Sequence, residues 1–216
     1  MKFLYMTDVH EYIGAMLYVA QNKNVDAIIL GGDIVSFGDL GHFWDALALL
    51  KRFSNGTIFF VPGNWEPIEI LLWEKFNDAI NLHANKVTYC EEILCGVGGV
   101  APRHFFFPLE FDLEDMQYYL LKLEKKLMDE KRVSIFSSHM IPHDNDYLIR
   151  FVRRLKPSFA LCGHAHNRKF VRSEGNTIFV NPGALYDGEY CIALASFWFG
   201  SPFLLGLSLP LLIVHY

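Results

Sequence analysis

Charge is scarce in this sequence, and positive charge shows no excess. Asp, Glu, Lys and Arg make up 20% of the 216 residues, and the formal net charge is −5. Proteins that coat nucleic acids carry a basic stripe, because contacts to phosphates dominate their affinity. The composition therefore excludes a nucleic-acid-coating role. Hydrophobic residues, at 52%, are enough for one sizeable core, and we expect a single main domain.

Cysteine pairs with a regular spacing are also missing. The four cysteines are Cys90, Cys95, Cys162 and Cys191. They form no CxxC pair, which predicts reduced thiols and a cytoplasmic location. The apolar run at the N-terminus meets Asp8 at once, so no secretion signal is expected there.

The C-terminal segment lacks charge altogether, since no Asp, Glu, Lys or Arg occurs from Tyr190 to Tyr216. A bilayer span needs roughly 20 apolar residues. This segment is interrupted by Gly200, Pro202, Gly206 and Pro210, and no basic cluster flanks it. We expect residues 1–199 to form the domain and 200–216 an apolar tail. The tail is interpreted as an extra strand or as a subunit interface of a homo-oligomer, with a membrane anchor as the less favoured alternative.

Short apolar runs alternate with amphipathic stretches along most of the chain. Strands are expected at residues 2–6, 26–30, 57–61, 83–89, 92–97, 133–137, 158–161, 169–172, 177–180 and 191–198. Helices are expected at residues 12–21, 43–53, from Pro67 onward, 113–128 and 144–155. This alternation predicts an α/β layer architecture, and the two groups of closely spaced strands predict two facing sheets.

Polar side chains follow five of the expected strands at the point where each strand ends. In chain order they are Asp8, His10, Asp33, Asn64, His139, His164 and His166. Ligands of open α/β sheets bind beyond the carboxyl ends of the strands, so we expect these side chains to gather along one rim. Each alone is readily explained as a turn or cap residue, but their joint occurrence favours a site. Seven carboxylate, amide and imidazole donors suit two ions such as manganese, iron or zinc that share a carboxylate.

The same residues form an ordered series of motifs. They are Asp8-Val9-His10, Gly32-Asp33, Gly63-Asn64, His139 and Gly163-His164-Ala165-His166. The series resembles the DxH, GD, GN, H and GHxH signature of the calcineurin-like metallophosphoesterases, and in particular their small stand-alone prokaryotic and archaeal members. The resemblance spans about residues 1 to 185.

The resemblance implies a fold, a cofactor and an activity. The fold is a four-layer α/β/β/α sandwich with two facing mixed β-sheets. One divalent ion would take Asp8, His10, Asp33 and His166, and the other Asp33, Asn64, His139 and His164. Manganese is favoured, with iron, zinc or nickel as alternatives. A bridging hydroxide would attack the phosphorus of a small phosphorylated substrate, which makes Asp33, Asn64 and His139 the implied catalytic residues.

One motif departs from the family pattern, which continues as Gly-Asn-His-Asp or Gly-Asn-His-Glu. This chain has Trp65 in place of the histidine that is thought to protonate the leaving group or steady the phosphate. An indole does not titrate in the working range, and loss of a positioned acid costs on the order of 100-fold to 10,000-fold in rate.

Three explanations of this departure remain open. The enzyme hydrolyses phosphodiesters or activated esters, with Trp65 as an apolar or stacking wall. Alternatively, His104 or His143 supplies the proton, although each alone is also explained as a surface residue. Separately, Arg103 follows the Gly-rich loop Gly96 to Gly99, and both phosphate contact and simple solvent exposure explain it. In the third explanation the protein is a non-catalytic metal-binding scaffold for protein interactions. We favour an enzyme, because a scaffold need not keep its ligands and all seven are here.

Overall fold

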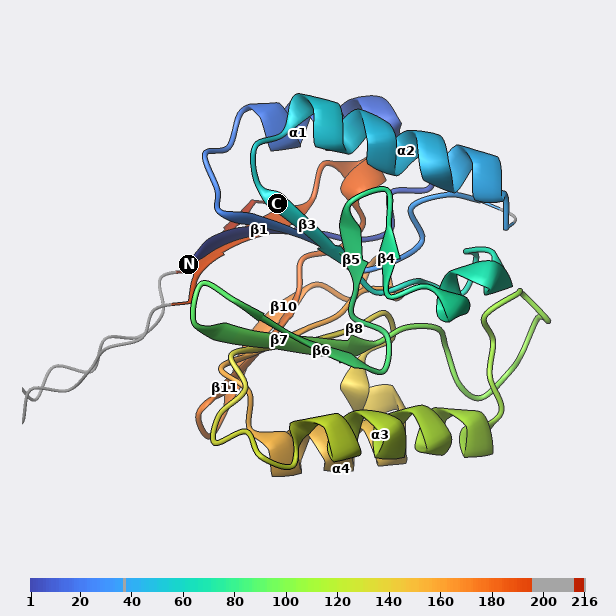
Figure 1. The fold of residues 1–216 in the computed structure, drawn as a ribbon, viewed down its shortest axis with the longest axis vertical. Helices are drawn as coiled ribbons and strands as arrows, with labels where there is room; N and C mark the ends of the chain where they lie inside the picture. The colour runs from blue at the N-terminus through green and yellow to red at the C-terminus, as the bar shows by residue number, and fades with distance from the viewer. Residues whose placement is uncertain (37, 196–211, 216) are drawn as a thin grey trace, which may run out of the picture.

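Two β-sheets lie face to face between two pairs of helices in the computed structural model, which describes residues 1–36, 38–195 and the backbone of 212–215 (Figure 1). The helices are α1 (Ile13–Gln21), α2 (Leu40–Phe53), α3 (Leu113–Leu127) and α4 (Asp146–Leu155). Helices α1 and α2 cover one sheet, and α3 and α4 cover the other (Figure 1). The expected α/β/β/α sandwich with two facing mixed sheets is confirmed.

The first sheet has the strand order β13-β12-β1-β2-β3-β5-β4. Its strands are β1 (Lys2–Met6), β2 (Ala27–Leu30), β3 (Thr57–Phe60), β4 (Lys75–Phe76), β5 (Ala79–Asn81), β12 (Tyr190–Leu194) and β13 (Leu212–His215). The central strands β1, β2, β3 and β5 are parallel, whereas β12, β13 and β4 add at the edges in antiparallel fashion. The parallel strands therefore all end at the same side of the sheet.

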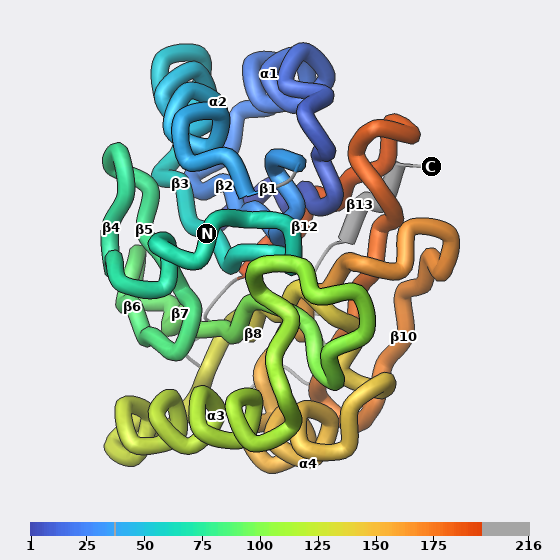
Figure 2. The backbone as a smooth tube through the Cα atoms, turned by 90° about the vertical axis from the view of Figure 1, so that its right-hand side faces the viewer, coloured from blue at the N-terminus to red at the C-terminus, as the bar shows by residue number. Residues whose placement is uncertain are grey.

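The second sheet has the order β10-β11-β9-β8-β7-β6. Its strands are β6 (Asn85–Tyr89), β7 (Glu92–Val97), β8 (Ile135–Ser138), β9 (Phe159–Leu161), β10 (Phe170–Glu174) and β11 (Thr177–Asn181). Strands β7, β8, β9 and β11 are parallel, and the two edge strands are antiparallel to their neighbours. The segments that follow β3 and β7 lie at one end of the molecule, which faces the viewer in Figure 2.

Alternate side chains along β1 show how the layers are held together. Leu4 and Met6 pack with the residues of α1 and α2, while Phe3 and Tyr5 pack between the sheets. Successive strand residues point to opposite faces, so a strand buried on both faces is apolar throughout. The ring of Phe3 meets Phe159 of the other sheet edge-on, with centroids 5.4 Å apart. The sandwich therefore has three apolar layers, of which the middle one joins the two sheets.

Two expected helices differ from the structure. Helix α2 begins at Leu40 rather than near residue 43, because the Asp39 carboxylate caps it by accepting the His42 N–H at 2.8 Å. After Pro67 the chain forms only the 3-10 helix η1 (Ile68–Leu72) and then the hairpin of β4 and β5. The hairpin turn is made by Asn77 and Asp78, whose φ angles of 46° and 64° suit a tight turn of this kind.

The C-terminal tail is described only in part. Strand β13 pairs antiparallel with β12, but residues 196–211 and 216 lie outside the described part of the chain. The expected strand at 191–198 is therefore seen as β12 up to Leu194, and the role of residues 200–216 stays a prediction. Across the described ranges 1–36, 38–195 and 212–215, no helix has the length and apolar character needed to cross a membrane.

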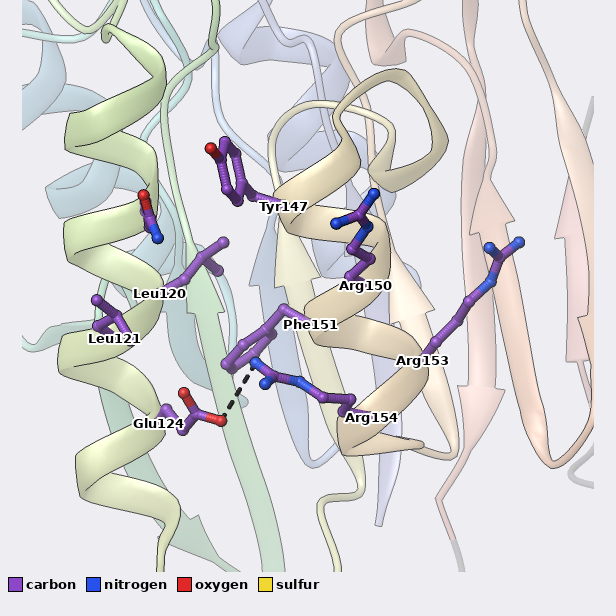
Figure 3. A pocket seen from close by; sticks show the side chains of 9 residues that line it. Leu120, Leu121, Glu124, Tyr147, Arg150, Phe151, Arg153 and Arg154 are labelled. Carbon is purple, nitrogen blue, oxygen red and sulfur yellow. Dashed lines mark ion pairs between the residues drawn. The ribbon is translucent and has the colours of Figure 1, made fainter.

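A groove of about 470 Å³ runs between α3 and α4 on the outer face of the second sheet (Figure 3). Leu120, Leu121 and Phe151 line it with apolar surface, and an ion pair between Arg154 and Glu124, 3.2 Å apart, links the two helices there. None of the predicted metal ligands lines this groove, so it is separate from the candidate site.

His83 is a buried titratable group in the connection between β5 and β6. Its Nδ1 atom accepts a hydrogen bond from the Gly98 N–H at 3.0 Å, and its ring packs on Tyr119 with centroids 4.3 Å apart. Its Nε2 atom has no hydrogen-bond partner among the residues that the structure describes. Burial, helped by the charge of Lys122, lowers the pKa of His83 to about 3.

This depressed pKa predicts an acid-sensitive stability. Between about pH 6.5 and pH 3 the unfolded chain binds a proton at His83 that the folded chain does not bind. The free energy of unfolding therefore decreases as the pH is lowered, by up to about 1.4 kcal/mol per pH unit. From pH 7 to pH 5, metal-free wild type should lose about 2 kcal/mol more unfolding free energy than His83→Gln, which cannot titrate. Urea unfolding at both pH values measures this difference, and equal losses in the two proteins would contradict the prediction.

Candidate metal centre

The candidate site forms where five strands end, and both sheets contribute to it. Strands β1, β2 and β3 of the first sheet run into Asp8, His10, Asp33 and Asn64. Strands β8 and β9 of the second sheet run into His139, His164 and His166. Asp8, Asp33, Asn64 and His139 are almost completely buried, whereas His10, His164 and His166 are partly open to solvent.

Tight turns at these strand ends aim the side chains inward. Asp8, Asp33 and His164 adopt left-handed backbone conformations with φ angles of 54°, 49° and 66°, which are uncommon outside glycine and cluster at functional sites. Glycine at position 63 is required sterically, because a Cβ atom there would lie 2.1 Å from the Asp33 Oδ1 atom. A Cβ atom at Gly163 would likewise lie 2.6 Å from Asp8 Oδ2. The motif glycines thus make room for the neighbouring carboxylates.

The donors gather into two groups, within each of which the ligand atoms lie within 4.8 Å of one another. The first group is Asp8, His10 and His166, and the second is Asp33, His139 and His164. The Asp33 Oδ2 atom lies 3.3 Å from His139 Nε2 and 3.8 Å from His10 Nε2, so it stands between the groups. The Asn64 Oδ1 atom lies 3.1 Å from His139 Nε2 and adds a further oxygen to the second group. All seven predicted donors are therefore brought together.

Two of the histidines are oriented by oxygen partners behind their rings. His139 Nδ1 lies 2.8 Å from the Gly31 carbonyl oxygen, and His166 Nδ1 lies 2.6 Å from the Tyr186 hydroxyl. With Nδ1 engaged in this way, the Nε2 atom of each ring faces the carboxylates. Metal-ligating histidines are commonly held like this, so the arrangement fits a metal site. Tyr186 was not predicted from the sequence, because no motif spacing connects it to His166.

Glu66, like Tyr186, supports the donor residues in a way that was not predicted from the sequence. Its buried carboxylate accepts hydrogen bonds from the N–H groups of Asp33 at 2.9 Å, Ile34 at 2.5 Å and Gly63 at 2.5 Å. These bonds tie the loop after β2 to the loop after β3. Glu66 therefore fixes Asp33 and Asn64 relative to each other. Burial and the neighbouring Asp33 charge raise the pKa of Glu66 to about 7.

The electrostatics of the cluster also fit cations. Burial disfavours a charged His139, but the carboxylates of Asp33 and Asp8 outweigh it and raise the pKa of His139 to about 10. Burial and the charge of His139 lower the pKa of His164 to about 4. A protonated imidazole thus offsets only part of the negative charge of the two buried carboxylates in the metal-free protein. Divalent cations would supply that positive charge instead, and this donor set suits them.

The residues predicted on the substrate side have different surroundings. Trp65 lies beside the cluster, with its ring centroid 5.2 Å from that of His10. Arg103 pairs with Asp112 at 3.8 Å, and the His104 backbone N–H donates to Glu110. His143 contacts Glu174, with Nε2 and Oε1 2.7 Å apart. Of the four predicted residues, Trp65 alone has a ring contact with a donor of the cluster within the described chain.

The sequence model of the calcineurin-like phosphoesterases matches residues 1–168. The chain belongs to this family. It is also 27% identical over 198 residues to an uncharacterized protein of Methanocaldococcus jannaschii, and the match covers 84% of this chain and 88% of that protein. The family match agrees with the motif series that ends at His166.

Solved structures share the fold of this calcineurin-like phosphoesterase. A protein of Thermus thermophilus superimposes with a TM-score of 0.69 at 19% identity, covering 88% of this chain and 92% of that one. A structure described as a novel archaeal phosphodiesterase gives a TM-score of 0.53 at 15% identity and covers 100% of both chains. At these identities the likeness concerns the fold.

Proposed function

We propose that this calcineurin-like phosphoesterase is a dinuclear metal-dependent enzyme that hydrolyses small phosphodiesters, with manganese as the metal. The observation that carries the proposal is the position of Asp33, whose Oδ2 atom lies between two groups of donors at 3.3 Å from His139 Nε2 and 3.8 Å from His10 Nε2. A shared carboxylate between two sets of ligands is the arrangement that two-metal hydrolases use.

The proposed ligands divide between two ions. Asp8, His10, Asp33 and His166 would hold one ion, and Asp33, Asn64, His139 and His164 the other. When bound, the two ions supply an attacking hydroxide at neutral pH and positive charge for the phosphoryl oxygens. The protein keeps the ligand atoms in position through the Glu66 carboxylate and the oxygen partners of His139 and His166. Such preorganisation limits the reorganisation needed during the reaction.

Trp65 supports the preference for diesters or esters with good leaving groups. Its indole N–H does not titrate in the working range, so it cannot act as the general acid that a poor leaving group needs. The archaeal structure with the same fold, which is described as a phosphodiesterase, agrees with this preference. We therefore assign Asp33, Asn64 and His139 to the catalytic centre. Trp65 does not donate a proton to the leaving group in this proposal.

The cellular setting is part of the same proposal. Cys90, Cys95, Cys162 and Cys191 are all free thiols, which supports a reducing, cytoplasmic compartment. The substrate would be a small phosphorylated molecule, because a net charge of −5 does not favour the many phosphate contacts of a nucleic-acid coat.

A non-catalytic metal-binding scaffold is the second candidate function. The observation that favours it is Trp65 in place of the family's histidine. Against it stands the complete set of donors, since a scaffold that works through its surface has no need of two closely spaced groups.

One assay separates these candidates. Purified protein is stripped with EDTA, titrated with Mn²⁺ by calorimetry, and assayed with bis-p-nitrophenyl phosphate. We expect two Mn²⁺ per chain, turnover that rises with occupancy, and loss of turnover on renewed chelation. Binding of Mn²⁺ without turnover of this activated diester would favour the scaffold. Absence of both binding and turnover would reject both candidates.

A further inference from the structure

An unbroken series of aromatic rings crosses the candidate metal centre. Centroid distances between successive rings are 6.1 Å from Phe105 to Phe107, 4.9 Å from Phe107 to Trp65, 5.2 Å from Trp65 to His10, 5.7 Å from His10 to Tyr186 and 5.8 Å from Tyr186 to Tyr12. His10 is a member of the first donor group, so the aromatic surface begins directly beside the cluster. We call Trp65, Phe107 and Phe105 the Trp65 arm.

The Trp65 arm exposes apolar rings where a substrate would enter. Trp65 and Phe107 are half-buried and stack with an interplanar angle of 25°, while Phe105 is 76% exposed. Contiguous apolar surface next to polar donors is typical of ligand sites, where the donors fix one group and the apolar wall receives the rest. Packing of the core does not explain the position of Phe105, since its side chain faces solvent.

The segment that carries Phe105 and Phe107 of the Trp65 arm is tied to the site by backbone hydrogen bonds. The buried Glu110 carboxylate accepts three successive backbone N–H groups, from His104 at 3.0 Å and from Phe105 and Phe106 at 2.7 Å. The Leu109 N–H donates to the backbone carbonyl of Asn64 at 3.2 Å. The aromatic rings are thus tied to the backbone of a donor residue. A surface that is fixed in advance loses little conformational freedom when a ligand binds.

We propose that the Trp65 arm binds a flat aromatic substituent of the substrate, an aryl group or a nucleobase, which packs against the open surface of the stacked Trp65–Phe107 pair. The inference rests on the proposed function, because it needs the phosphate of the ester at the donor cluster. The Trp65 ring centroid is 5.2 Å from that of the donor residue His10, so the arm lies next to the position where the phosphate would be held. Stacking of a base or an aryl group on such rings strengthens binding by about tenfold, and it tolerates different bases because each has a π-face.

Direct binding to the Mn²⁺-loaded protein tests this inference without requiring turnover. Calorimetry compares methylphosphonate, phenylphosphonate and thymidine 5′-monophosphate, which carry a methyl, an aryl and a nucleobase-bearing substituent. We expect at least one of the two aromatic ligands to bind wild type about tenfold more tightly than methylphosphonate. Which of them gains tells whether the arm prefers an aryl group or a base.

Substitutions then assign the gain to the Trp65 arm. Trp65→Leu and Phe107→Leu should reduce the ratio of aromatic to methyl affinity about tenfold, and Phe105→Leu, which alters an exposed side chain only, about threefold. Tyr18→Leu is the matched control, because Tyr18 is an aromatic residue on α1 that is 71% exposed, and it should keep the wild-type ratio.

Two results would have different meanings. An affinity ratio that stays at the wild-type value in all three arm variants would overturn the aromatic subsite, while turnover of bis-p-nitrophenyl phosphate would leave the phosphoesterase proposal standing. Failure of Mn²⁺-loaded wild type to hydrolyse any ester would instead refute the proposed function, whatever the phosphonate affinities.

Discussion

Asp33→Asn should lower kcat/KM for bis-p-nitrophenyl phosphate on the order of 1,000-fold in saturating Mn²⁺. The substitution removes the one carboxylate that lies between both donor groups, at 3.3 Å from His139 Nε2 and 3.8 Å from His10 Nε2. An amide oxygen keeps the size of the side chain but loses the negative charge that two adjacent dications would share. Steady-state assays with p-nitrophenolate release measure the change.

The fold should survive this substitution, so the loss can be assigned to the site. Asp33 Oδ1 accepts the Trp65 N–H at 3.0 Å, and an asparagine carbonyl can accept the same bond. Mn²⁺ should raise the melting temperature of wild type, because a ligand that binds only the folded state stabilises it, and should raise that of Asp33→Asn less. Asp45→Asn, on the exposed face of α2, is the control for removing a charge. A decrease of less than threefold for Asp33→Asn would exclude Asp33 from the mechanism.

Trp65→His should increase the hydrolysis of esters with poor leaving groups on the order of 100-fold relative to esters with good ones. Residue 65 lies beside the cluster, so an imidazole there can reach a leaving oxygen that the indole cannot protonate. The measurement is kcat/KM for methyl phenyl phosphate against methyl p-nitrophenyl phosphate, which differ in the basicity of the leaving group.

The control for this substitution is Trp65→Leu, which removes the indole and offers no proton. Both variants lose the indole that stacks on Phe107 at 4.9 Å. Because esters with good and poor leaving groups are compared within each variant, a general loss of packing cancels from the ratio, and the difference between the two ratios reports on the imidazole as a proton donor. If Trp65→His and Trp65→Leu show the same dependence on the leaving group, a proton donor at position 65 has no part in this enzyme.

The strand ends could be located from the sequence because each is marked by a local pattern. An apolar run that stops at Asp8, Asp33 or Asn64 predicts both the strand and the end at which its donor lies, since parallel strands bring their carboxyl ends together. Tertiary contacts decide the rest. Glu66 is visible in the sequence, but its role depends on the loop after β2 lying against the loop after β3.

The Trp65 arm illustrates the same limit. The sequence marks Trp65 as a departure from the family pattern, and it shows consecutive phenylalanines before Pro108. It does not show that Phe107 stacks on Trp65, because the segment between β7 and α3 has no periodicity that would fix its path. The hairpin of β4 and β5 escaped prediction for a related reason, since strands of two and three residues are too short for an alternating pattern.

Each donor group draws on both halves of the sandwich. Asp8 and His10 come from the first sheet and are joined by His166 from the second, while Asp33 from the first is joined by His139 and His164. A nascent chain that has completed only its N-terminal half therefore possesses no finished cation site. Binding of the proposed ions would therefore wait until the C-terminal half has docked, and the ions would then act as cross-links that resist separation of the halves.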